Sequence, residues 1–239
     1  MIRVAFAAGL ALLGGLAHAD PPAPPALPLD EVIRRTIEVM DRQPERMVCR
    51  VRSEKVVLDG DGKADEDERV DIEETREGPE TSWKVVHKVK NGRDVTAQAQ
   101  ADERRKEDER TRKGDQKGKN DDLMMPFSKK WSSHYHFELL RTEHLWGRPT
   151  YVVRVSALDH KPEAGNGTAW IDAESFVPLR GVYVPAKLPD KADWAKFQMQ
   201  YVLHSNGVAG PSYLRFEGAG HWWFVRKAFR QTLRWADCR

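Results

Sequence analysis

Apolar and polar residues alternate along most of this chain, in segments separated by residues typical of tight turns. Asp59-Gly60-Asp61-Gly62, Asn91-Gly92 and Asn206-Gly207 are such turns, because Asp-Gly and Asn-Gly pairs adopt the positive φ angles that hairpins need. Alternation with a period of two indicates strands with one buried face. The expected strands lie at about 47–51, 68–76, 83–89, 135–139, 151–155, 168–172, 176–186, 196–204 and 221–235. Strands in succession with short turns predict one large antiparallel sheet.

One amphipathic helix precedes the strands, over about 29–42. Ile33, Ile37 and Met40 follow a helical spacing, and Asp30 can cap the start. A sheet of this size must curl or close on itself, and one helix covers only part of its apolar face. We therefore expect an α+β, mainly β fold. Its curved antiparallel sheet forms an unclosed half-barrel, with the N-terminal helix and a possible lid segment on the concave face.

The first residues have the pattern of a secretory signal peptide. Arg3 supplies a positive start, Val4 to Leu16 is apolar, and Ala17-His18-Ala19 is a small-x-small cleavage pattern. The alternative is a membrane anchor, but a bilayer span needs roughly twenty apolar residues. We predict a signal peptide over 1–19, cleaved after Ala19, and therefore a periplasmic protein.

The mature chain is expected to form one domain. A Pro-rich leader covers 20–28, and a half-barrel domain follows over 29–239. A charged insertion at about 97–122 has no apolar stripe, which predicts a solvated helix or a loop. The insertion ends in an apolar cluster, which is either a loop pinned to the body or a lid over a hydrophobic mouth. The lid candidates are Leu123, Met124, Met125 and Phe127.

Charge argues against nucleic-acid binding. The chain has 39 Lys and Arg against 37 Asp and Glu, so it lacks the basic excess of nucleic-acid-binding proteins. Arg226, Arg230 and Arg234 share one face of the last expected strand, where they are available to anionic head groups or an acidic partner, or simply solvated. We expect a monomer.

The two cysteines, Cys49 and Cys238, lie near the ends of the first and last expected strands. In an oxidising compartment such a pair predicts a disulfide, and the alternative is two buried thiols. A bond closing so long a loop would stabilise the fold by about 4 kcal/mol.

The covering elements look too few for the area of the sheet, which predicts a hollow on the concave face. Such a hollow is a site for an apolar ligand. Ordinary core packing is the alternative for each aromatic residue. The ligand-lining candidates are Trp170, Phe197, Tyr201, Trp223 and Phe229.

In the C-terminal half, Gly167-Thr168-Ala169-Trp170-Ile171-Asp172 is followed by Phe176-Val177-Pro178-Leu179-Arg180. This strand-turn-strand resembles that of the periplasmic lipoprotein carriers, the LolA and LolB proteins, and of their LppX and RseB relatives. The resemblance implies an unclosed barrel with helices at its mouth, and binding of lipid or acylated protein. No residue is matched to the carriers' functional arginine, so no site residue is carried over.

These observations favour a periplasmic carrier that holds the acyl chains of a lipid or lipoprotein without cofactor or covalent chemistry. One alternative is an envelope-stress sensor or regulatory module with the same fold, which would bind an envelope or inner-membrane protein. A second alternative is a metal-dependent enzyme.

Metal sites have weak support in the sequence. An EF-hand loop starting at Asp59 would place Ala64 and Val70 where calcium binding needs Gly and an acidic residue. His134 and His136 could share one face of a strand, but zinc would need a third ligand. We therefore predict no metal site, no cofactor and no enzymatic activity.

Overall fold

The computed structural model describes residues 27–42, 44–78, 80–113, 125–159, 161, 163–222 and 225–239. The predicted signal peptide, most of the leader and the candidates Leu123, Met124 and Trp223 lie outside these residues. None of the described helices is long and apolar enough to cross a membrane.

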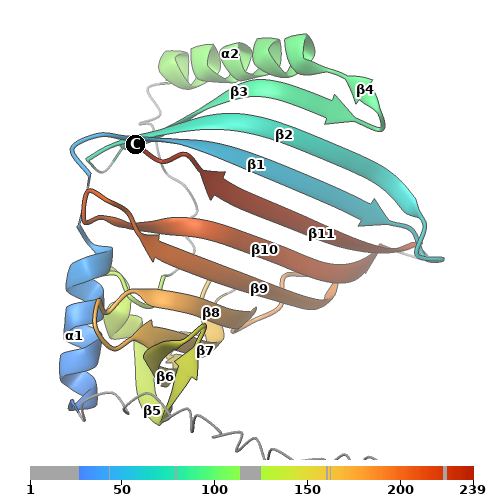
Figure 1. The fold of residues 1–239 in the computed structure, drawn as a ribbon. Coiled ribbons are helices and arrows are strands. Elements are labelled where there is room, and N and C mark those ends of the chain that lie inside the picture. The colour runs from blue at the N-terminus through green and yellow to red at the C-terminus, as the bar shows by residue number, and fades with distance from the viewer. Residues whose placement is uncertain are drawn as a thin grey trace, which may run out of the picture.

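The structure is mainly β, with one antiparallel sheet of eleven strands in the order β4-β3-β2-β1-β11-β10-β9-β8-β7-β6-β5 (Figure 1). Its end strands, β4 and β5, do not meet, so the sheet is an unclosed half-barrel as predicted. The strands are β1 (Met47–Leu58), β2 (Ala64–Glu77), β3 (Glu80–Lys90), β4 (Arg93–Asp94), β5 (Tyr135–Leu145), β6 (Arg148–Ala157), β7 (Gly165–Asp172), β8 (Pro178–Pro185), β9 (Ala192–Leu203), β10 (Ala209–Trp222) and β11 (Val225–Ala236). The helices are α1 (Leu29–Met40), α2 (Thr96–Lys113) and a short 3-10 helix, η1 (Ser132–His134).

The first and last strands lie side by side in the middle of the sheet. Two meanders, β1 to β4 and β5 to β11, join there through antiparallel pairing of β1 with β11. The predicted disulfide between Cys49 and Cys238 is confirmed, and it closes a sequence separation of 189. The bond links β1 to the residues that follow β11, and it therefore joins the two meanders where they pair.

Helix α1 packs on the inner face of the sheet, which we define as the face that bears the apolar core. Val32, Ile33 and Val39 are buried and belong to the same cluster as the side chains of β6, β7 and β9. The predicted helix is therefore confirmed, but its buried side chains are Val32, Ile33, Thr36 and Val39, whereas Ile37 and Met40 are partly buried. Pro28, not Asp30, occupies the N-cap position, and Asp30 lies in the first turn.

Strand β2 is interior to the sheet although its sequence is mostly polar. It lies between β1 and β3. Its acidic side chains are matched by basic ones across the strands: Glu66 contacts Lys55 and Lys90 at 3.1 Å each, and Glu68 contacts Lys88 at 3.0 Å. Cross-strand pairing of opposite charges allows a polar strand to occupy an interior position.

The C-terminal segment forms two strands where one was predicted over 221–235. Strand β10 ends at Trp222 and β11 begins at Val225. Gly210, Pro211, Gly218 and Gly220 obscure the alternation over β10, because glycine and proline are poor strand formers in most sequences. Strand β10 was therefore missed, and β9 and β11 flank it in the sheet.

Helix α2 covers the outer edge of β3 (Figure 1). Gln100 donates its side-chain amide to the carbonyl of Val85 at 3.0 Å, and the Glu103 carboxylate accepts the Val85 N–H at 3.3 Å. Thr96 accepts the N–H of Lys88 through its hydroxyl at 2.9 Å. The first part of the charged insertion therefore forms a helix. Strand β4 pairs with only two residues of β3, and polar side chains of α2 form hydrogen bonds with other backbone groups along that edge of β3.

Candidate functional site

A cavity of about 210 Å³ lies on the inner face, bounded by the C-terminal end of α1, by residues 125–128 and by β8 and β9. Most of its lining is apolar. The lining residues are Met40, Asp41, Met125, Phe127, Ser128, Pro178, Gly181, Tyr183, Met199 and Tyr201. Three methionines among these residues make the wall adaptable, since the thioether side chain is unbranched and polarisable.

The sheet wall depends on the register between β8 and β9. Gly181 pairs with Met199, and Tyr183 pairs with Phe197, so these side-chain positions share the inner face. The Tyr183 ring folds back over Gly181, where an added Cβ would lie 2.7 Å from the Tyr183 hydroxyl. The missing side chain at Gly181 therefore leaves room for the Tyr183 ring.

The opposite wall comes from the segment that precedes η1. Phe127 is 4% exposed, and its ring stacks on Phe137 of β5 at 5.6 Å. The Ser128 hydroxyl donates to the carbonyl of Met125 at 3.1 Å, which closes a local turn. The Lys129 N–H donates to the Asp41 carboxylate and so ties this segment to the end of α1.

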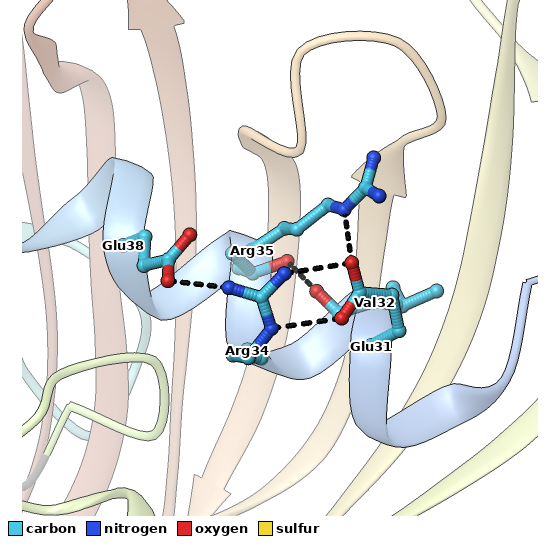
Figure 2. Close-up of polar contacts among 6 residues, drawn as sticks. Glu31, Val32, Arg34, Arg35 and Glu38 are labelled. Carbon is cyan, nitrogen blue, oxygen red and sulfur yellow. Dashed lines mark hydrogen bonds and ion pairs between the residues drawn. The ribbon is translucent and has the colours of Figure 1, made fainter.

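Helix α1 presents a network of ion pairs on its solvent side (Figure 2). Arg34 contacts Glu31 at 2.7 Å and Glu38 at 2.5 Å, and Arg35 contacts Glu31 at 2.5 Å. The hydrogen bonds from Arg34 and then Arg35 lower the pKa of Glu31 to about 2. Pairs at these helical spacings support the helix that forms one end of the cavity.

The lining that β8 and β9 contribute carries no charged side chain. Burial raises the pKa of both Tyr183 and Tyr201 well above the usual tyrosine value, so both hydroxyls stay protonated. The Tyr201 hydroxyl donates to the Met199 sulfur at 3.9 Å. Asp41 is the charged member of the lining, and its carboxylate is held by the Lys129 N–H. An apolar chain therefore fits this interior, whereas an ionised group would lose its hydration there.

Several predicted residues lie at or beside this cavity. Tyr201, Met125 and Phe127 line it. Phe197 is buried next to it, with its ring stacked on Tyr183 at 5.2 Å. Phe229 lies farther along the inner face, where its ring contacts Phe216 at 5.3 Å and is outside the cavity lining.

Trp170 lies on the outer face of the sheet and does not line the cavity. Its neighbours Ala169 and Ile171 are buried in the core, and alternation along the strand turns Trp170 the other way. Its indole N–H donates to Glu143 at 2.6 Å, and the Arg180 guanidinium lies 5.1 Å from its ring centre.

Met40, Asp41, Tyr183 and Met199 line the cavity but were not singled out from the sequence. Met199 lies between Phe197 and Tyr201 in an alternation that the sequence does show, so its place on the same face could have been predicted. Asp41 had no local signal, because its partner Lys129 is 88 residues away.

The expected arginine stripe lies on the outer face and is paired with carboxylates. Because these charges are already matched, a free basic stripe for anionic head groups is absent there. The pairs are Arg226 with Asp193 at 3.5 Å, Arg230 with Glu217 at 3.8 Å and Arg234 with Glu54 at 2.9 Å.

No group of three or more His, Cys, Asp or Glu side chains suited to a metal ion occurs within the described ranges. His134 lies in η1 and its Nδ1 is 2.5 Å from a carboxylate oxygen of Asp159, whereas His136 lies in β5. The Asp59 carboxylate accepts the N–H groups of Asp61 and Lys63, so it stabilises its own turn.

No family model and no curated protein matches the sequence. The structure is similar to a LolA superfamily protein, NE2245 from Nitrosomonas europaea, with a TM-score of 0.42, 12% identity, and coverage of 90% of this chain and 94% of that one. A putative outer membrane lipoprotein-sorting protein domain from Vibrio parahaemolyticus matches with a TM-score of 0.39, 10% identity, and coverage of 87% and 90%. The MucA/MucB complex structure of Pseudomonas aeruginosa matches with a TM-score of 0.27, 10% identity, and coverage of 87% and 93%. No ligand or partner is transferred from these structures to this chain.

Proposed function

We propose that this protein binds the acyl chain of a lipid or lipoprotein in the cavity between α1, residues 125–128 and β8–β9, and carries it without covalent chemistry. The observation that carries the proposal is an apolar hollow of about 210 Å³ whose buried tyrosine hydroxyls stay neutral. Its lining supplies dispersion contacts and no buried ion pair, which suits a hydrocarbon.

The cavity volume sets the expected affinity. Because an apolar cavity of about 150 Å³ holds benzene, one of this size holds about eight carbon atoms. Burying a methylene is worth about 0.8 kcal/mol, so the gross gain is about 6 kcal/mol. Before the cost of association is subtracted, that gain corresponds to a dissociation constant of tens of micromolar, which permits both loading and release.

A periplasmic location is part of the proposal. The predicted signal peptide supports it, and so does the disulfide between Cys49 and Cys238, because such bonds persist in oxidising compartments. A carrier that moves between two membranes needs to diffuse in the space between them, and a cleaved signal peptide releases it there.

The test is displacement of a fluorescent apolar probe from purified protein, with 1-decanol as the competitor. We expect saturable binding and displacement at micromolar to tens of micromolar concentration. Met199→Trp fills part of the cavity and should weaken binding severalfold, whereas Gln198→Trp, on the outer face of the same strand, should not. Absence of saturable binding by the folded protein, or equal loss in both variants, would refute the proposal.

A further inference from the structure

We infer that the preferred ligand is a single-chain anionic amphiphile, whose tail enters the cavity and whose head group lies at the rim beside Arg42 and Lys129. This inference rests on the proposed function and names the class of ligand for the same site. It is carried by the cavity volume, by the chemistry of the lining and by the charges next to the two polar lining residues.

The volume admits one chain. At about eight carbon atoms, the cavity is too small for the two or three long chains of a diacyl lipid or a triacylated protein. Phe127 and Tyr183, which bound the space on opposite sides, are both nearly fully buried, so the walls are packed against the core behind them. A ligand with one flexible tail therefore matches the space.

The head group must remain at the rim. Apolar side chains and neutral hydroxyls line the interior, and burying an ionised group among them would be costly. The polar lining residues Asp41 and Ser128 are brought together by the hydrogen bond from Lys129 to Asp41, and they mark the polar end of the cavity.

Two exposed basic residues adjoin the polar lining residues in the sequence. Arg42 directly follows Asp41, Lys129 directly follows Ser128, and both basic residues are exposed. Within the described part of the chain neither basic side chain forms an ion pair, in contrast to the paired arginines of the outer face. The Asp41 carboxylate already accepts the Lys129 N–H through both oxygens, at 3.0 and 3.2 Å. Two cations against one engaged carboxylate favour an anionic head group.

The experiment compares ligands that share a ten-carbon tail and differ in head-group charge. Decanoate, which is ionised at neutral pH, 1-decanol and decyltrimethylammonium each compete for the fluorescent probe at low ionic strength. We expect decanoate to bind about five- to tenfold more tightly than decanol, and decyltrimethylammonium to bind more weakly than decanol, since two exposed charge contacts contribute modestly. Added salt should reduce the preference.

The double variant R42Q/K129Q should bring decanoate and decanol to equal affinity. Lys196→Gln, an exposed cation on the outer face, is the matched control and should retain the preference. Decanoyl lysophosphatidylglycerol distinguishes the two sources of such a ligand: tighter binding than decanoate assigns a lipid, and weaker binding assigns a free fatty acid.

Two other outcomes separate the inference from the proposed function. Equal binding of decanoate and decanol by the unaltered protein would overturn the anionic preference and leave the apolar site standing. No binding of any ten-carbon ligand would overturn both. Retention of the full preference in R42Q/K129Q would overturn the assignment of the rim residues.

Discussion

The Asp41 carboxylate accepts the backbone N–H of Lys129 at 3.0 and 3.2 Å, across a separation of 88 residues. Asp41 caps the C-terminal end of α1, and Lys129 follows the segment that forms the opposite wall of the cavity. This hydrogen bond therefore joins two elements that line the cavity and lie far apart in the chain.

Removing that carboxylate should accelerate ligand release. For Asp41→Ala we expect the dissociation rate of a bound apolar probe to rise about tenfold, because a hydrogen bond to a charged group contributes about 1.5 kcal/mol. Stopped-flow fluorescence measures the rate. Asp41→Asn keeps one acceptor oxygen, so its dissociation rate should lie between those of the unaltered protein and Asp41→Ala. An unchanged release rate in a folded Asp41→Ala protein would show that the contact does not hold the walls together.

A side chain at Gly181 should disturb the sheet wall of the cavity. Gly181→Ala places a Cβ 2.7 Å from the Tyr183 hydroxyl and closer to its ring, so the ring must move. We expect a loss of about 1–3 kcal/mol in unfolding free energy, together with weaker probe binding. Urea denaturation and probe titration measure the two effects.

Gly60→Ala is the control, since its Cβ would lie 3.8 Å from the nearest atom, the Arg226 carbonyl oxygen. That substitution should leave both measurements unchanged. Normal stability and binding in Gly181→Ala would mean that Tyr183 has room to move without cost.

Loss of the disulfide should destabilise the fold without changing its strand order. Cys49→Ser combined with Cys238→Ser removes a cross-link that closes 189 residues, and we expect the unfolding free energy to fall by about 4 kcal/mol. Urea denaturation of the variant, and of the unaltered protein with and without reductant, provides the comparison. Reductant should have no effect on the variant. Equal stability of all three samples would contradict the prediction.

Helix α1 should lose electrostatic support in acid. The pKa of Glu31 is lowered to about 2 from the usual 4.5, chiefly by its hydrogen bond with Arg34. A lowered folded-state pKa contributes stability above about pH 4.5, and this contribution disappears as the pH falls through about 2. Thermal unfolding of the unaltered protein and Glu31→Gln across this range should show a Tm difference that shrinks towards zero in acid. A difference that does not vary with pH would exclude the ion pairs as its cause.

Helix α2 should protect the edge of β3 from pairing with other chains. Gln100→Ala with Glu103→Ala removes both side-chain contacts to the Val85 backbone, and exposed strand edges promote association. We expect concentration-dependent self-association in sedimentation velocity. The control, Gln98→Ala with Asp102→Ala, removes an amide and a carboxylate elsewhere on the helix. This variant should self-associate no more than the unaltered protein.

Local patterns in the sequence predicted most of the elements. Period-two alternation and Asp-Gly or Asn-Gly turns predicted the strands, and the spacing of Ile33, Ile37 and Met40 predicted α1. Both signals depend on residues a few positions apart. Strand β10 was not predicted, because glycine and proline interrupt its alternation. Trp170 was expected to line the cavity but lies on the outer face of the sheet. Alternation shows that a strand has two faces, but it does not show which of them is buried.

The sequence by itself indicated the class of fold and the helix α1, and it favoured a disulfide between the two cysteines of the chain over two buried thiols. Tertiary structure decided that β1 lies against β11, that Tyr183 lies over Gly181 beside Met199, and that Asp41 holds the segment at Lys129. These contacts join residues far apart in the chain, so no local periodicity encodes them. The cavity exists only where those distant contacts leave a volume unfilled, and for that reason its lining could not be identified from the strands alone.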